Sequence, residues 1–328
     1  MFVRLRPLLA LGAGLALLAP AARASCGAAS CPIEIQSFNA PTVGHWSLDL
    51  SYQYIDQDRP RIGTHGAQVG EIPSEHDEVR TINRTATLNL RYALSNRFEL
   101  GVTAPWISRF HEHLEEGEAE SWHLNDSGDV SLQGQARLWN RGRQASLWLT
   151  AAVELPTGPN DLKNDGGERA EPALQPGSGS TDATLGLALR GQLLRDTALE
   201  GPLGHTTAIP WFAAVSYRRN GKGDERYRLG DELLANAGVA YPLGFLVGRF
   251  EALFQLNARF RGKDSPGSSG EDPSFTGGTY LYASPGLRVS GGESWGGYVY
   301  VQLPLYQDVH KLQLVSRANW LGGVQMRF

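Results

Sequence analysis

Large apolar side chains recur at every second position in many segments of the chain. The segment 46–54 is the first example, and 250–260 is the clearest later one. A repeat of two is the side-chain period of a β-strand, whose successive side chains point to opposite faces. We therefore expect about twelve strands, at 46–54, 82–92, 98–106, 130–138, 147–155, 183–189, 211–217, 233–241, 250–260, 281–289, 299–305 and 320–328.

The connections between these segments alternate between short and long. The short ones are 94–96, 140–143, 242–245 and 291–294, and the long polar ones are 56–79, 107–127, 156–181, 219–229 and 261–278. Bacterial outer-membrane barrels have short periplasmic turns and long extracellular loops. Roughly ten residues of tilted strand span a bilayer, which is close to the length of most segments. We predict an all-β fold, a single closed antiparallel transmembrane β-barrel at 46–328. The connection 195–206 is longer than this scheme predicts.

The chain begins with the features of a secretory signal peptide, which we place at 1–24. Arg4 and Arg6 precede an apolar run at 8–18, and Ala22-Arg23-Ala24 fits a small-x-small cleavage site. No later stretch approaches the roughly 20 apolar residues of a spanning helix, so a membrane location requires a closed barrel. We expect 25–45 to be a periplasmic segment, in which the oxidising compartment favours a disulfide between Cys26 and Cys31.

Composition and charge agree with β structure and narrow the list of partners. The 328 residues include 39 Gly, 11 Tyr and 8 Trp but only two Met, a profile that suits turn-rich sheets. A formal net charge of −4 is too small to indicate a nucleic-acid partner. No cofactor is expected, and the partners we expect in the bacterial outer membrane are lipid, lipopolysaccharide and a small-molecule solute.

Charged residues fall on the polar side of the alternation, which would face the interior of a barrel. Basic residues that face lipid near the bilayer midplane cost roughly 2–4 kcal/mol, so they are expected to point inward. Rings of charge select solutes, but opposite charges also pair and fill a narrow lumen, and we weigh these outcomes nearly equally. The charged residues expected to line the lumen are Asp49, Arg91, Glu99, Arg137, Glu154, Arg190, Arg249, Glu251 and Arg259.

The final segment of the chain ends in an aromatic residue. Phe328 is terminal, and Trp320, Val324 and Met326 occupy alternate positions before it. A terminal aromatic residue on an alternating strand resembles the signal that barrel-assembly machinery recognises. We therefore expect these four residues to act as an assembly signal.

Two histidines in the predicted loop 107–127 are candidate metal ligands. His111 and His113 would share one face of a strand and are followed by Glu115 and Glu116. A solvated acidic loop beside lipopolysaccharide explains the same residues without a bound ion, and the sequence favours that interpretation.

Five short motifs rich in glycine and proline lie at the ends of predicted strands, where these residues stop or turn the chain. The motifs are Gly128-Asp129-Val130, Glu154-Leu155-Pro156-Thr157-Gly158, Gly177-Ser178-Gly179-Ser180-Thr181-Asp182, Ser284-Pro285-Gly286-Leu287 and Gln302-Leu303-Pro304-Leu305-Tyr306-Gln307-Asp308. In order and spacing they resemble the family described as "MetA-pathway of phenol degradation", a group of outer-membrane, transporter-like barrels. The resemblance covers most of the chain after the second long loop and implies passage or binding of small molecules, with the solute left open.

The hypothesis we favour is a channel for passive passage of small solutes, with hydrophobic or aromatic solutes among the candidates. The alternative is a non-conducting structural or surface-interaction barrel whose loops bind cations. An outer-membrane hydrolase is the weakest reading, because no GxSxG motif occurs and His310 has no serine near it in the sequence. The expectation is that the chain is not an enzyme.

Overall fold

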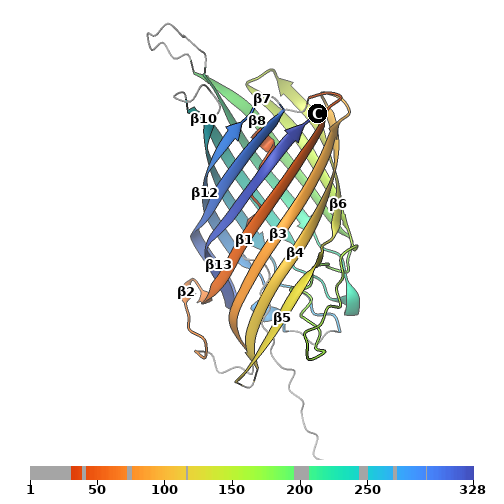
Figure 1. Ribbon diagram of the computed structural model, residues 1–328, viewed down its shortest axis with the longest axis vertical. Helices are drawn as coiled ribbons and strands as arrows, with labels where there is room; N and C mark the ends of the chain where they lie inside the picture. Colours follow the sequence, from red (N-terminus) through yellow and green to blue (C-terminus); the bar gives the residue numbers. More distant parts are fainter. Residues whose placement is uncertain are drawn as a thin grey trace, which may run out of the picture.

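The computed structural model describes residues 31–38, 42–71, 76–115, 117–195, 207–243, 250–268, 272–292 and 294–328. They form one antiparallel barrel of tilted strands (Figure 1). No helix among them is long and apolar enough to cross a membrane. The strands are β1 Trp46–Gly63, β2 His65–Gly66, β3 His76–Ala93, β4 Phe98–Glu115, β5 Glu118–Ser127, β6 Val130–Arg141, β7 Ala145–Leu155, β8 Asp182–Arg195, β9 Thr207–Arg219, β10 Glu232–Leu243, β11 Phe250–Arg261, β12 Gly278–Ser290 and β13 Trp295–Arg327. The described residues also form the short 3-10 helices η1 Gln36–Phe38, η2 Asp224–Arg226 and η4 Pro273–Phe275.

The barrel closes because the last strand pairs with the first. β13 folds back near Lys311, whose φ is 51°. Its first leg pairs with β12 as far as Val309, and its second leg pairs with β1 from Leu312 to Arg327. β5 and β6 follow one another along β4 and are separated only by Gly128 and Asp129. With the two legs of β13 counted separately, the described residues form a closed ring of about twelve strands, as the alternation predicted.

The two faces of the barrel wall differ in chemistry, as the alternation also predicted. On the outside, Leu50, Leu100, Leu185, Phe260 and Leu305 are each more than half exposed. The buried residues on the inward face are largely polar. The outer face is therefore an apolar belt, which is the surface that a bilayer requires of a spanning barrel. Examples of the buried inward residues are Asp49, Asn83, Glu99, Gln255, Asn257, Ser284, Gln302 and Asn319.

The connections separate the barrel into two ends. The short turns 94–97 and 142–144 lie at the end that carries the C-terminus, which is uppermost in Figure 1 and is called the turn end here. The long connections 156–181, 220–231 and 262–277 lie at the opposite end, called the loop end.

The predicted loops 56–79 and 107–127 are largely strand, which corrects the sequence interpretation. β4 and β5 form a hairpin, and within it the inner face of β5 is apolar and its outer face is polar. Trp122 and Leu124 are buried, whereas Ser121, His123 and Asn125 are exposed. The apolar residues of β5 therefore face inward, whereas those of the apolar belt face outward. A pattern of outward apolar residues does not predict this strand.

Residues 31–38, which belong to the segment 25–45, lie inside the barrel. The periplasmic location expected for 25–45 stays a prediction. The side-chain amide of Gln302 donates to the carbonyl of Cys31 at 2.9 Å. The backbone N–H of Glu34 donates to Gln255 at 3.1 Å, and the Gln255 amide donates back to the carbonyl of Glu34 at 2.7 Å. Phe38 packs edge-to-face against Phe212, with ring centroids 4.9 Å apart. Apolar side chains of this segment are buried against inward aromatic residues of the wall, which favours the lumen over water.

Candidate functional site

Most of the lumen charges expected from the sequence are paired across neighbouring strands. Arg91 Nη1 and Glu99 Oε1 are 2.6 Å apart, with side chains 15% and 7% exposed. Asp49 accepts hydrogen bonds from the Tyr298 hydroxyl at 3.0 and 3.1 Å. Arg249 lies outside the described residues.

Three further expected charges, Glu154, Glu251 and Arg259, form ion pairs with residues that we did not expect among the lumen charges. Arg218 binds both Glu154 and Asp182, and the distance to Asp182 is 2.6 Å. Glu251 pairs with Arg288, and Arg259 pairs with Glu232. These partner residues occupy inward-facing positions of their strands, so the alternation could have identified them as lumen residues. Their pairing depends on strand register, which the sequence pattern does not state.

Two of the expected lumen charges, Arg137 and Arg190, have no ion pair among the described residues, and together with Arg143 they line one cavity at the turn end. This arginine pocket, about 210 Å³, is formed by Arg137, Arg143, Arg190, Trp148 and Phe38 with neighbouring small and polar residues. Trp148 is buried, and the guanidinium carbons of Arg190 and Arg137 lie 5.2 and 5.7 Å from its ring centroid. Both distances are within cation–π range.

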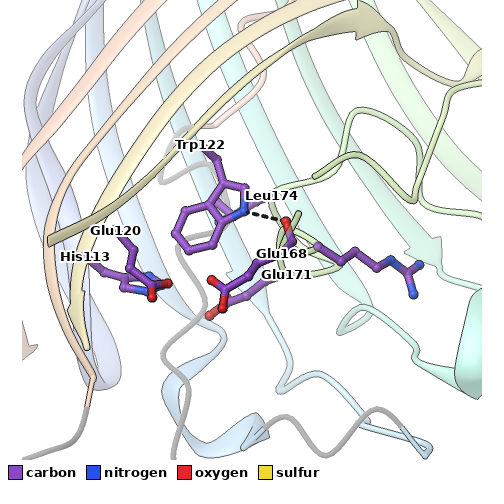
Figure 2. A pocket seen from close by; sticks show the side chains of 7 residues that line it. His113, Glu120, Trp122, Glu168, Glu171 and Leu174 are labelled. Carbon is purple, nitrogen blue, oxygen red and sulfur yellow. Dashed lines mark hydrogen bonds and ion pairs between the residues drawn. The ribbon is translucent and has the colours of Figure 1, made fainter. Parts of the chain in front are cut away.

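A second cavity, of about 260 Å³, lies at the loop end and has the opposite charge. This mouth pocket is lined by His113, Glu120, Trp122, Glu168, Arg169, Glu171 and Leu174. Figure 2 shows His113 and Glu120 on one side of the gap and Glu168 and Glu171 on the other, near the Trp122 ring.

The wall of the mouth pocket includes the long connection 156–181, which folds against the inner side of β5. The Trp122 Nε1–H donates to the carbonyl of Glu168 at 3.2 Å. Arg109 donates to the carbonyls of Ala173, at 3.2 Å, and Leu174. Leu174 packs with Trp122 and with Leu314 of β13. The connection therefore narrows the lumen at this end.

The motifs that resemble the transporter-like family meet where this connection leaves and rejoins the wall. Asp129 accepts from the backbone N–H of Gly158 at 2.9 Å and from the N–H and hydroxyl of Ser178, both at 2.7 Å. A Cβ on Gly177 would lie 2.2 Å from the carbonyl oxygen of Gly158, so only glycine permits this approach. The motifs thus form a structural anchor.

A second contact between loops fixes the loop end. The Tyr227 hydroxyl donates to Asp264 at 2.8 Å, and burial, reinforced by Asp264, raises the pKa of this phenol. Asp264 also accepts from the backbone N–H of Gly230 at 2.7 Å and from Arg261 at 2.9 Å. The connections 220–231 and 262–277 are therefore tied together.

His111 and His113 lie on one face of β4, but within the barrel wall and not in a solvated loop. Both are buried, and His111 Nε2 is 3.3 Å from His113 Nδ1. Glu78 lies 3.7 Å from His111, and Glu120 lies 3.5 Å from His113. The described part of the chain contains no group of three or more His, Cys, Asp or Glu that could hold a metal ion.

Cys31 is fully buried among Tyr280, Tyr282 and Val309, and burial raises the pKa of its thiol to about 12. Cys26 lies outside the described residues, so the disulfide stays a prediction.

The expected assembly residues share the outer face of the last strand leg. Trp320, Val324, Met326 and Phe328 are each 43% to 62% exposed. Their recognition by assembly machinery stays a prediction.

Comparisons with known proteins bear on the fold. No protein-family model matches the chain, and neither does any curated protein. The COG4313 outer membrane channel from Pseudomonas putida F1 is 14% identical, with a TM-score of 0.60, over 90% of this chain and 100% of that chain. A FadL homologue from Pseudomonas aeruginosa is 10% identical, with a TM-score of 0.44, over 89% of this chain and 93% of that chain. The chain therefore has the fold of the COG4313 channel.

Proposed function

We propose that this protein is an outer-membrane channel through which small solutes pass passively. The observation that carries the proposal is the closed ring with an apolar outer belt and a polar, charged interior. A soluble barrel would have the reverse arrangement. The likeness to a known outer-membrane channel supports the same conclusion. Lipid and lipopolysaccharide would surround the belt, and barrel-assembly machinery would insert the chain after the signal peptide is removed.

Two segments inside the barrel imply that solute passage is gated. The segment 31–38 packs inside the lumen and lines the arginine pocket with Ser37 and Phe38, and the connection 156–181 narrows the loop end. The described residues of this first segment contact the wall through hydrogen bonds and side-chain packing, and they form no strand pairing with it. Displacing it therefore leaves the wall intact.

Conductance of the purified protein in planar bilayers tests the proposal. The full mature chain is compared with a variant that lacks residues 25–38. We expect stepwise conductance that is larger in the deletion variant, because the lumen loses its filling. Glu251→Gln should alter ion selectivity, and Glu118→Gln, at an exposed position of β5, serves as the matched control.

The filled lumen also favours a second candidate, a closed structural or surface-interaction barrel. That candidate predicts that the full chain and the deletion variant are both silent although folded and inserted. Such a result would overturn the channel proposal.

A further inference from the structure

We propose that the arginine pocket is a binding site for a small organic anion with a flat apolar body, such as an aromatic carboxylate. Binding rests on the pocket alone. Transport of the bound anion rests in addition on the proposed channel function.

The charge of the pocket indicates an anion. Arg137, Arg143 and Arg190 line it, and no carboxylate does so among the described residues. Glu34 and Glu99 act on Arg190 through space, but neither lines the pocket. Glu99 is engaged by Arg91 at 2.6 Å and by the Gln135 amide. The positive charge at this site is therefore not neutralised by an adjacent pair.

Arg190 has hydrogen-bond donors that the described residues do not satisfy. Its Nη2 donates to Gln135 Oε1 at 2.7 Å. Its Nε and Nη1 are buried and have no acceptor in the described part of the chain. A guanidinium presents a planar fork that matches the two oxygens of a carboxylate. A carboxylate bound in the pocket would meet the guanidinium groups of Arg137 and Arg143, while Arg190 adds positive charge from the wall.

Two aromatic residues lie in the wall of the pocket beside small and polar ones, and they restrict the shape of the ligand. The buried Trp148 ring lies near the guanidinium groups of two arginines, and Phe38, at the end of the lumen segment 31–38, forms another part of the wall. A volume of about 210 Å³ is below the roughly 300–1,000 Å³ of most ligand pockets, which restricts the ligand to about one ring. An aromatic ring would lie beside Trp148 and Phe38 while its carboxylate meets the arginines.

The test is fluorine NMR of the full mature chain in detergent with three probes of one shape. Fluorobenzoate carries a negative charge, fluorobenzyl alcohol none and fluorobenzylamine a positive charge. We expect saturable binding of fluorobenzoate that is at least about tenfold tighter than that of the alcohol, as one or two charge-assisted hydrogen bonds imply. Equal binding of acid and alcohol would overturn the proposal.

Variants locate the site. Arg143→Gln changes an exposed turn residue that lines the pocket, so it is compatible with folding, and Arg137→Gln removes a second cation. Each should weaken fluorobenzoate binding by about tenfold. Arg141→Gln, an exposed arginine outside the pocket lining, should leave binding within about twofold. Loss of affinity in all three variants, or in none, would contradict the assignment.

Bilayer recordings separate this inference from the proposed channel. Binding of fluorobenzoate to a silent barrel would overturn the channel but keep the pocket. Conductance without charge-selective binding would overturn the pocket but keep the channel.

Discussion

The two ends of the lumen each place one buried tryptophan beside a cavity, but their charges are opposite. At the loop end, Trp122 lies among Glu120, Glu168 and Glu171. The single arginine of the mouth pocket, Arg169, lies 3.4 Å from Asp224 and 3.5 Å from a second loop carboxylate. At the turn end, Trp148 meets arginines without a carboxylate in the described lining. A net charge of −4 for the whole chain therefore says little about what either end attracts.

The ends also differ in how they are built. The arginine pocket is formed mainly by barrel strands and a short turn, so the backbone ladder fixes most of its wall. The mouth pocket depends on a long connection that packing and the Asp129 anchor hold against β5. Changes at the loop end should therefore act on local stability, whereas changes at the turn end should act on binding.

Replacing the two tryptophans tests this difference and should give the largest effect. Trp122→Ala removes a ring packed against Leu124, Ala170, Leu174 and Leu314, and should cost about 3–5 kcal/mol. Trp148→Ala should cost less, because its neighbours include two charged guanidinium groups. Urea unfolding in detergent measures both values. A larger loss of unfolding free energy in Trp148→Ala than in Trp122→Ala would contradict this difference between the two ends.

Breaking the loop anchor should release the loop end alone. Asp129→Asn removes the charge that receives hydrogen bonds from Gly158 and Ser178, each worth about 1.5–3 kcal/mol when the acceptor is ionised. We expect faster proteolysis within 156–181 and unchanged fluorobenzoate binding. Asp161→Asn, at an exposed position of the same connection, should leave the cleavage rate unchanged. Equal rates of cleavage in the two variants would show that Asp129 does not anchor the connection.

The thiol of Cys31 reports whether the lumen segment stays in place. In a Cys26→Ser background, maleimide labelling at pH 8 should be at least about a hundredfold slower than for an ordinary thiol of pKa about 8.5. The pKa is raised to about 12, so the thiol remains protonated and the rate should still be rising above pH 9. Phe38→Ala should accelerate labelling by weakening the contact with Phe212. A plateau near pH 8.5 in the unaltered segment would show that Cys31 is exposed.

The smallest effect is expected at Arg169. Its ion pairs with Asp224 and Glu225 involve carboxylates that are 59% and 49% exposed, so Arg169→Gln should change the unfolding free energy by about 1 kcal/mol or less. A loss of several kcal/mol in urea unfolding would mean that this arginine holds the connection in place, contrary to the role given to Asp129.

The period-two pattern was sufficient to predict the strands of the barrel wall and which side chains face outward. Each of the segments expected from the alternation lies within a strand except for the terminal Phe328, and Leu50 and Phe260 face outward as predicted. Strand periodicity is local, because neighbouring positions must alternate between lipid and lumen. The inward charges at Glu99 and Arg190 were predicted by the same rule.

The contents of the lumen were decided only by tertiary structure. Ile33, Ile35 and Phe38 carry no periodic signal, yet they pack inside the barrel, because its inner aromatic surface is available only after closure. The opposite charges of the two pockets likewise depend on strand register and on where 156–181 packs. Contacts between segments distant in sequence produce no periodic pattern in either segment. The alternation therefore predicts the strands of the barrel wall but not the residues that fill the lumen.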